Sequence, residues 1–92
     1  MKKYDTIFLD RDGTINPDPG YINSLNDFKF YDFTFNALKN LKRLTKQFCI
    51  ITNQSGVARG FYSEKDVNKL HSWMNFELKK IDAKIDDFFY CP

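Results

Sequence analysis

Residues 4–14 read YDTIFLDRDGT, and this stretch decides the fold class of the chain. Its first part, residues 4–10, is a short apolar run that ends in an acid, as is typical of a buried parallel strand. Gly13 permits a sharp turn directly after that strand. Asp10 and Asp12 therefore leave the strand two residues apart, and their carboxylates can converge on one small volume.

The rest of the chain alternates between helical and strand patterns. Residues 11–31 are expected to form a long loop, which in a compact domain is usually functional. After it the patterns predict a helix over 32–46, a strand over 48–52, a loop over 53–62, a helix over 63–81 and a strand over 85–90. Ser63 and Asp66 form a capping pair that opens the second helix. This order predicts an α/β fold with a parallel sheet and right-handed crossovers.

Composition excludes several classes of protein. The 92 residues suffice for one small domain, and 42% hydrophobic and 17% aromatic residues indicate a globular chain. The net charge of +2 comes from 14 basic and 12 acidic residues without a basic tract, so we expect no nucleic-acid partner. No apolar run approaches the roughly 18 residues of a membrane span. Two cysteines and no signal-peptide pattern favour the cytoplasm.

The paired acids are the strongest chemical signal. In parallel sheets, ligands bind outside the carboxyl ends of the strands, which is where Asp10 and Asp12 fall. Two neighbouring carboxylates repel each other unless a cation offsets their charge, which implies a hard metal such as magnesium. One carboxylate can attack phosphorus while the other protonates the leaving oxygen. An ordinary solvated Asp-Gly turn is the alternative, and the preceding strand and the following Thr14 argue against it.

The motifs resemble those of one superfamily. FLDRDGT at residues 8–14 resembles the first signature of the haloacid dehalogenase-like (HAD) hydrolases, and CIIT at 49–52 resembles the second. Within that superfamily the chain resembles the D-glycero-D-manno-heptose 1,7-bisphosphate phosphatases and the related histidinol-phosphatases. The matching segments are FLDRDGTIN (8–16), Gly20-Tyr21, TNQSG (52–56), ARG (58–60) and YCP (90–92).

The resemblance implies a HAD-like Rossmannoid three-layer α/β/α fold, of which this chain holds the first three strands and two helices. It makes Asp10 the nucleophile and a magnesium ligand. Asp12 becomes the general acid and base, and ligates magnesium through its backbone carbonyl. Thr52 would hold the phosphoryl group of a small-molecule sugar phosphate. The substrate pocket would be lined by Asn53, Gln54, Ser55 and Arg59.

Other family elements are expected beyond the third strand. These are a lysine that steadies the phosphate, an acidic pair that completes the magnesium site, and most of a zinc loop whose first ligand would be Cys91. We therefore expect residues 1–92 to be the amino-terminal part of a single HAD-like phosphatase domain, truncated and inactive alone. The first strand would then be an exposed edge that invites self-association.

The leading hypothesis is a phosphomonoester hydrolase that forms an aspartyl phosphate and acts on the 7-phosphate of heptose bisphosphate, in the pathway to lipopolysaccharide heptose. The alternatives are a histidinol-phosphate phosphatase and a non-catalytic remnant that associates with another chain. Two further residues are expected to have plain roles. His71, within the second helix, should be a packing or surface residue, and Cys49 an inert core thiol.

Overall fold

The structure is a computed structural model that describes residues 3–17 and 28–91, apart from the Ser55 side chain. Its strands are β1 (Tyr4–Leu9), β2 (Thr45–Asn53) and β3 (Asp87–Cys91). They form one parallel sheet in the order β1-β2-β3. The α/β fold with a parallel sheet is therefore confirmed. The Gly20-Tyr21 pair of the long loop lies outside the described residues.

Two longer helices connect the strands. α1 (Thr34–Leu41) continues into the 3-10 turn η2 (Lys42–Leu44), and α3 (Glu64–Leu78) continues into η3 (Lys79–Ile81). The predicted capping box opens α3, because the Ser63 hydroxyl accepts from the Asp66 amide and the Asp66 carboxylate accepts from the Ser63 amide. This hydrogen bonding lowers the pKa of Asp66.

Several element boundaries differ from expectation: the helix expected over 32–46 ends at Leu41 before η2, and the strand expected over 85–90 spans Asp87–Cys91. β2 begins at Thr45 rather than at Phe48, because Thr45 pairs with Tyr4 at the start of β1. That pairing is a tertiary contact, which local patterns do not encode. The segment 53–62 was expected to be a loop, yet it contains the short helix α2 (Ser55–Ala58).

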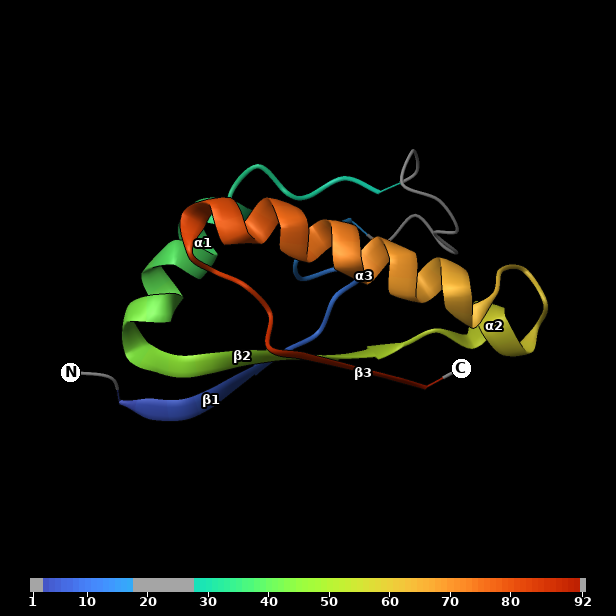
Figure 1. Cartoon of the computed structure of the whole chain (residues 1–92), viewed down its shortest axis with the longest axis horizontal. Coiled ribbons are helices and arrows are strands. Elements are labelled where there is room, and N and C mark those ends of the chain that lie inside the picture. The colour runs from blue at the N-terminus through green and yellow to red at the C-terminus, as the bar shows by residue number, and fades with distance from the viewer. Residues whose placement is uncertain (1–2, 18–27, 92) are drawn as a thin grey trace.

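The two long helices cover one face of the sheet, as Figure 1 shows. Both crossovers step across the sheet in the same direction, so crossovers of the same hand place both helices on the same side. The apolar core forms there, with Phe48 and Ile50 of β2 against Leu38 of α1 and against Met74 and Leu78 of α3. On the opposite face, the described residues leave Phe8, Ile51 and Phe89 exposed at 61%, 54% and 53%. The second helical layer of the three-layer family fold is thus absent from the described residues.

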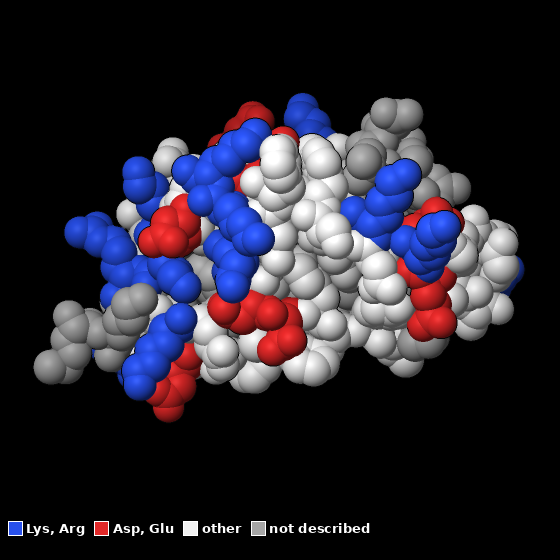
Figure 2. Space-filling model, in the orientation of Figure 1, with Lys and Arg blue, Asp and Glu red and all other residues white. Residues whose placement is uncertain are grey.

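Basic side chains gather at the end of the molecule where α1 ends, at the left of Figure 2. A hollow of about 340 Å³ there is lined by Lys39, Lys42, Arg43, Ile81 and Asp82. Other lysines in the described residues pair with acids, namely Lys46 with Asp5, Lys80 with Glu77 and Lys84 with Asp86.

Within the described residues, no helix is both long and apolar enough to cross a membrane.

Candidate active site at the carboxyl ends of β1 and β2

A tight turn follows β1. Gly13 adopts a left-handed φ of 87°, as the sequence predicted for a sharp turn. The carbonyl of Arg11 accepts hydrogen bonds from the amides of Thr14 and Ile15 at 3.2 and 2.8 Å. The loop is tied to α1 because the Thr34 hydroxyl donates to the Ile15 carbonyl at 2.7 Å. These hydrogen bonds restrict the backbone of the turn that follows Asp10 and carries Asp12.

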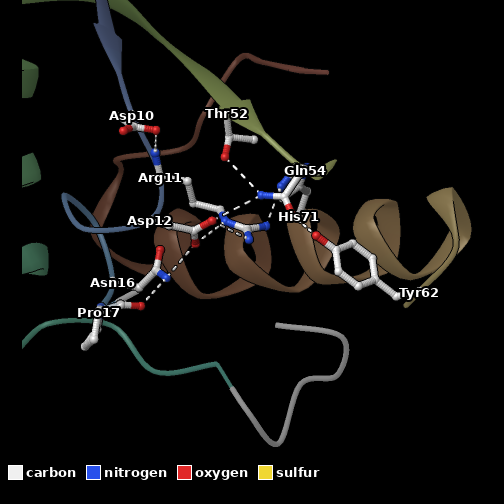
Figure 3. Close-up of polar contacts among 9 residues, drawn as sticks. All are labelled: Asp10, Arg11, Asp12, Asn16, Pro17, Thr52, Gln54, Tyr62 and His71. Atoms are coloured by element: carbon white, nitrogen blue, oxygen red, sulfur yellow. Dashed lines mark hydrogen bonds and ion pairs between the residues drawn. The ribbon is translucent and has the colours of Figure 1, made fainter. Parts of the chain in front are cut away.

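Asp10 is exposed, and its Oδ1 accepts from the Arg11 backbone amide at 2.9 Å. In Figure 3 its carboxylate sits apart from the cluster of side chains that surrounds Asp12. An exposed carboxylate with one local hydrogen bond remains available to a ligand or to an electrophile. This is the environment that the predicted nucleophile needs.

Asp12 is held by four side-chain donors. Its Oδ1 accepts from Arg11 Nε and Asn16 Nδ2, both at 2.9 Å. Its Oδ2 accepts from Arg11 Nη2 at 3.0 Å and from Gln54 Nε2 at 3.2 Å. These donors occupy the roughly four lone-pair sites of an ionised carboxylate. Figure 3 shows them converging on Asp12 from the turn after β1 and from the end of β2.

Arg11 is the least expected member of the cluster. Its side chain is only 1% exposed, although arginine is almost never fully buried unless it is paired. Nε and Nη2 form a bidentate ion pair with the Asp12 carboxylate, and Nη1 donates to His71 Nε2 at 3.1 Å. His71 was expected to be a packing or surface residue; it is buried, and it also binds Arg11. Burial, followed by the positive charge of Arg11, lowers the pKa of His71 from 6.5 to about 4.

Gln54 joins Asp12 to β2 and to the segment before α3. Its Nε2 also donates to the Thr52 hydroxyl at 3.0 Å, and its Oε1 accepts from the Tyr62 hydroxyl. A Cβ added to Gly56 would lie 2.2 Å from a ring carbon of Tyr62, so only glycine leaves room for that ring. Gln54 is 2% exposed, which places its side chain behind Asp12 rather than on an open surface.

The other predicted pocket residues lie around the carboxyl end of β2. Thr52 and Asn53 belong to a hollow of about 320 Å³, lined also by Ile51, Phe89, Tyr90 and Cys91. Thr52 is buried and Asn53 is exposed. Ser55 begins α2, and its side chain is outside the described atoms. Arg59 is exposed in the turn between α2 and α3, next to Gly60, which has a φ of 75°.

The expected metal sites are only partly represented. Asp10 offers an exposed carboxylate, and carboxylate and carbonyl oxygens suit magnesium. Residues 3–17 and 28–91 contain no cluster of three or more His, Cys, Asp or Glu side chains that could hold a metal ion. The ligand roles expected for the Asp10 carboxylate and the Asp12 carbonyl stay predictions. Cys91 is exposed at the end of β3, and its zinc role stays a prediction.

Four residues of this network were missed by sequence reasoning: Arg11, Asn16, Tyr62 and His71. Asn16 lies within the FLDRDGTIN segment, but the resemblance implied no role for it. Arg11 stands between two acids, which is itself a signal, since a buried cation would balance them. Nothing local indicates that Tyr62 or His71 reaches the site, because these contacts span 8 and 60 residues of sequence.

Comparison with known proteins adds independent findings. No family model matches the chain. It is 45% identical over 86 residues to the D-glycero-beta-D-manno-heptose-1,7-bisphosphate 7-phosphatase of Haemophilus influenzae, a match covering 94% of this chain and 47% of that protein. It is 42% identical over 91 residues to the Escherichia coli protein of the same name, covering 99% of this chain and 48% of that protein.

A solved structure is similar as well. It is the D,D-heptose 1,7-bisphosphate phosphatase from B. bronchiseptica complexed with magnesium and phosphate, with a TM-score of 0.87 and 30% identity. The match covers 96% of this chain and 50% of that one. The expected resemblance to heptose bisphosphate phosphatases is therefore confirmed, and the fold is that of HAD-like phosphatases. The chain spans about half the length of the curated relatives it matches.

Proposed function

We propose that this chain supplies the nucleophile, the general acid and part of the phosphate site of a phosphomonoester hydrolase acting in the cytoplasm. Its substrate is D-glycero-D-manno-heptose 1,7-bisphosphate, which loses its 7-phosphate. The observation that supports this most is the 42–45% identity to proteins of that name over 94–99% of the chain. The position of Asp10, exposed at the carboxyl end of β1, fits the same proposal.

In the proposed reaction Asp10 attacks phosphorus. A carboxylate oxygen of Asp10 forms a bond to phosphorus while the bond from phosphorus to the sugar oxygen breaks. The departing sugar oxygen takes a proton from the carboxyl group of Asp12. Water then attacks the aspartyl phosphate, Asp12 accepts the proton of that water, and phosphate leaves with Asp10 restored.

The hydrogen bonds around Asp12 put a condition on this step. Both of its carboxylate oxygens accept two hydrogen bonds, so no lone pair is left for a transferable proton. At least one donor must withdraw before Asp12 can carry a proton toward the leaving oxygen. Gln54 is the first candidate, because its 3.2 Å contact is the longest of the four and is made by a neutral group.

Other residues would bind rather than react. The Thr52 hydroxyl and the Asn53 amide would bind the phosphoryl group held at Asp10, and Arg59 would bind a second phosphate through two N–H groups. A magnesium ion, held in part by Asp10 and the Asp12 carbonyl, would supply positive charge that offsets the phosphoryl oxygens. The relative from B. bronchiseptica was solved with magnesium and phosphate.

The test uses a form of the protein extended to the full length of its relatives. We expect magnesium-dependent phosphate release from heptose 1,7-bisphosphate with kcat/KM well above that for histidinol phosphate. Asp10→Asn is the matched control, since it keeps the shape of the side chain. Equal kcat/KM values for both substrates would defeat the substrate assignment, and a preference for histidinol phosphate would favour the alternative.

The 92-residue chain alone should release no phosphate at a useful rate, even in millimolar magnesium. Its described residues offer too few ligands for an octahedral ion. Preorganised charge on the phosphoryl group is usually the largest catalytic contribution, and no lysine follows Lys84 in the sequence. Robust magnesium-dependent turnover by the isolated chain would show that other residues complete the site.

A second candidate function is association, which the exposed face of the sheet favours. Phe8, Ile51 and Phe89 present apolar surface there, and β1 is an edge of the described sheet. We propose that the isolated chain pairs with a second copy through this face. Sedimentation should detect a dimer that Phe89→Lys weakens. Phe76→Lys is the matched control, because Phe76 is as exposed, at 63%, but lies on α3. A monomer at all concentrations would refute the pairing.

A further inference from the structure

His71 lies in the middle of α3 and is 4% exposed. Its ring stacks on Phe88 of β3, with centroids 4.2 Å apart and planes 13° apart. Tyr90 of the same strand approaches the imidazole in an edge-on arrangement at 6.1 Å. Two aromatic contacts from β3 therefore fix the plane of the imidazole and the direction in which its nitrogens point.

The fixed ring offers Arg11 an acceptor. Two guanidinium nitrogens of Arg11, Nε and Nη2, are used by Asp12, and Nη1 lies 3.1 Å from His71 Nε2. Arginine has no acceptor atom, so Nη1 donates and Nε2 accepts. The imidazole is then neutral and carries its single proton on Nδ1. The guanidinium is thereby held at two sites, by a carboxylate on one side and by an imidazole on the other.

We propose that His71 is a positioning residue that fixes the Arg11 guanidinium, and through it the carboxylate of Asp12. The importance of Asp12 rests on the function proposed above, whereas the hydrogen-bond arrangement does not. Without an acceptor at Nε2, the Nη1 donors of Arg11 would be buried and unsatisfied, and the guanidinium would turn to find another partner. Any such rotation breaks the parallel alignment of the two bonds to Asp12.

The environment of His71 Nδ1 favours a positioning role for the imidazole over a role in packing alone. It is buried and has no hydrogen-bond partner among the described residues. A buried N–H without an acceptor is costly, and an apolar ring would fill the position without that cost. Since the imidazole leaves Nδ1 unsatisfied, what it contributes beyond packing is the acceptor at Nε2.

The experiment separates the ring from the acceptor with two variants of the chain. His71→Phe keeps a ring that can stack on Phe88 but removes the acceptor. His71→Gln loses the ring but places an amide oxygen near the position of Nε2. Ser72→Ala, at the exposed neighbouring position on α3, is the control. The readout is the solvent exchange rate of the Arg11 Nε–H proton, measured by nuclear magnetic resonance on labelled protein.

We expect His71→Phe to speed exchange at Arg11 by roughly tenfold or more, as for the loss of one hydrogen bond to a charged group. His71→Gln should stay within a few-fold of the parent chain, and Ser72→Ala should match it. Faster exchange in His71→Gln than in His71→Phe would show that only ring packing matters. Equal exchange in both variants would overturn the proposal as well, because a retained acceptor should rescue Arg11.

A measurement on the parent chain keeps the test decisive if a variant fails to fold. The nitrogen chemical shifts of His71, the only histidine in the chain, report which ring nitrogen carries the proton. A proton on Nδ1 and none on Nε2 is required, and the opposite tautomer would overturn the proposal. None of these readouts needs turnover, so failure of the proposed phosphatase activity would leave them interpretable.

Discussion

Two carboxylates of one turn stand in opposite environments. Asp10 is exposed and, among the described residues, accepts one hydrogen bond, from a neighbouring backbone amide. Asp12 accepts four, from side chains that come from the turn after β1 and from the end of β2. The ion pair with Arg11 then extends the contacts of Asp12 to α3 through His71. One acid is left exposed at the surface, while the other, with a side chain 16% exposed, is hydrogen-bonded to buried side chains.

This difference teaches how a small sheet can separate reactivity from stability. A residue that must form and break a covalent bond is better without structural duties, because each partner would have to be displaced during the reaction. A residue that moves a proton depends on its orientation, which several rigid partners can fix. Substitutions on the Asp10 side should therefore affect catalysis alone, and those on the Asp12 side should affect catalysis and folding together.

The largest effect is expected for Asp10→Asn in a form of the protein that is active. Loss of the nucleophile should lower kcat by several orders of magnitude. The free energy of unfolding should change by less than about 0.5 kcal/mol, as for most exposed positions. Denaturant unfolding and phosphate release, measured on the same preparation, check both halves. A clearly destabilised Asp10→Asn protein would break the comparison.

Asp12→Asn should act on both properties. Turnover should fall by ~10²–10⁴-fold for an alkyl phosphate, and by less for p-nitrophenyl phosphate, whose leaving group needs no proton. Removing the charge of Asp12 should also destabilise the fold by about 1–3 kcal/mol, because Arg11 keeps its charge with 1% exposure while Asp12 is 16% exposed. Equal losses on both substrates would argue against Asp12 as the acid. Unchanged stability would show that Arg11 finds another partner.

The sequence predicts one side of this comparison better than the other. The strand before Asp10 and the turn at Gly13 are local features, and both are found, although β1 lies at the edge of the described sheet with no buried residue, whereas a buried strand was predicted. The capping box that opens α3 is local as well. The network around Asp12 depends on contacts such as Arg11 to His71, which are 60 residues apart in sequence. No periodicity or spacing encodes such a pair, since it arises only when α3 docks on the sheet.

Candidate site residues chosen by resemblance to a family are a different case from those chosen by a physical pattern. Thr52 and Gln54 were selected by their match to the TNQSG segment, and both lie in the network at the carboxyl end of β2. The match does not distinguish a side chain that touches substrate from one that orients another residue. Gln54 is 2% exposed and bonded to Asp12, Thr52 and Tyr62, which is the environment of an orienting residue.

Gly56→Ala should sharpen the comparison through a residue that touches neither acid. Its new Cβ would lie 2.2 Å from the Tyr62 ring, so the ring must move and its hydrogen bond to Gln54 must break. Overpacking and the lost bond together should lower the free energy of unfolding by about 2–4 kcal/mol. Adding Tyr62→Leu should recover part of this loss by making room. Strictly additive losses in the double variant would exclude the steric explanation.

The smallest expected effect is a pH dependence that belongs to the Asp12 side alone. The folded chain protonates His71 only near pH 4, while its ordinary pKa is 6.5, because burial and the charge of Arg11 disfavour the imidazolium. The nearby negative charge of Asp12 acts in the opposite direction but is the weaker cause. Between these two pKa values the unfolded chain binds more protons than the folded chain, so stability falls as pH falls.

Lowering the pH from 7 to 5 should therefore reduce the free energy of unfolding by about 2 kcal/mol. His71→Phe should remove this dependence, because the chain has no other histidine and few carboxylates titrate in that interval. Asp10→Asn should leave it intact, since Asp10 accepts from the Arg11 backbone amide and, among the described residues, makes no hydrogen bond with the buried side chains around Asp12. Denaturant unfolding of the parent chain, His71→Phe and Asp10→Asn at pH 7 and pH 5 measures this dependence. An equal slope in the parent chain and in His71→Phe would mean that the buried imidazole is not neutral, and the Asp12 side would then lose its fixed acceptor.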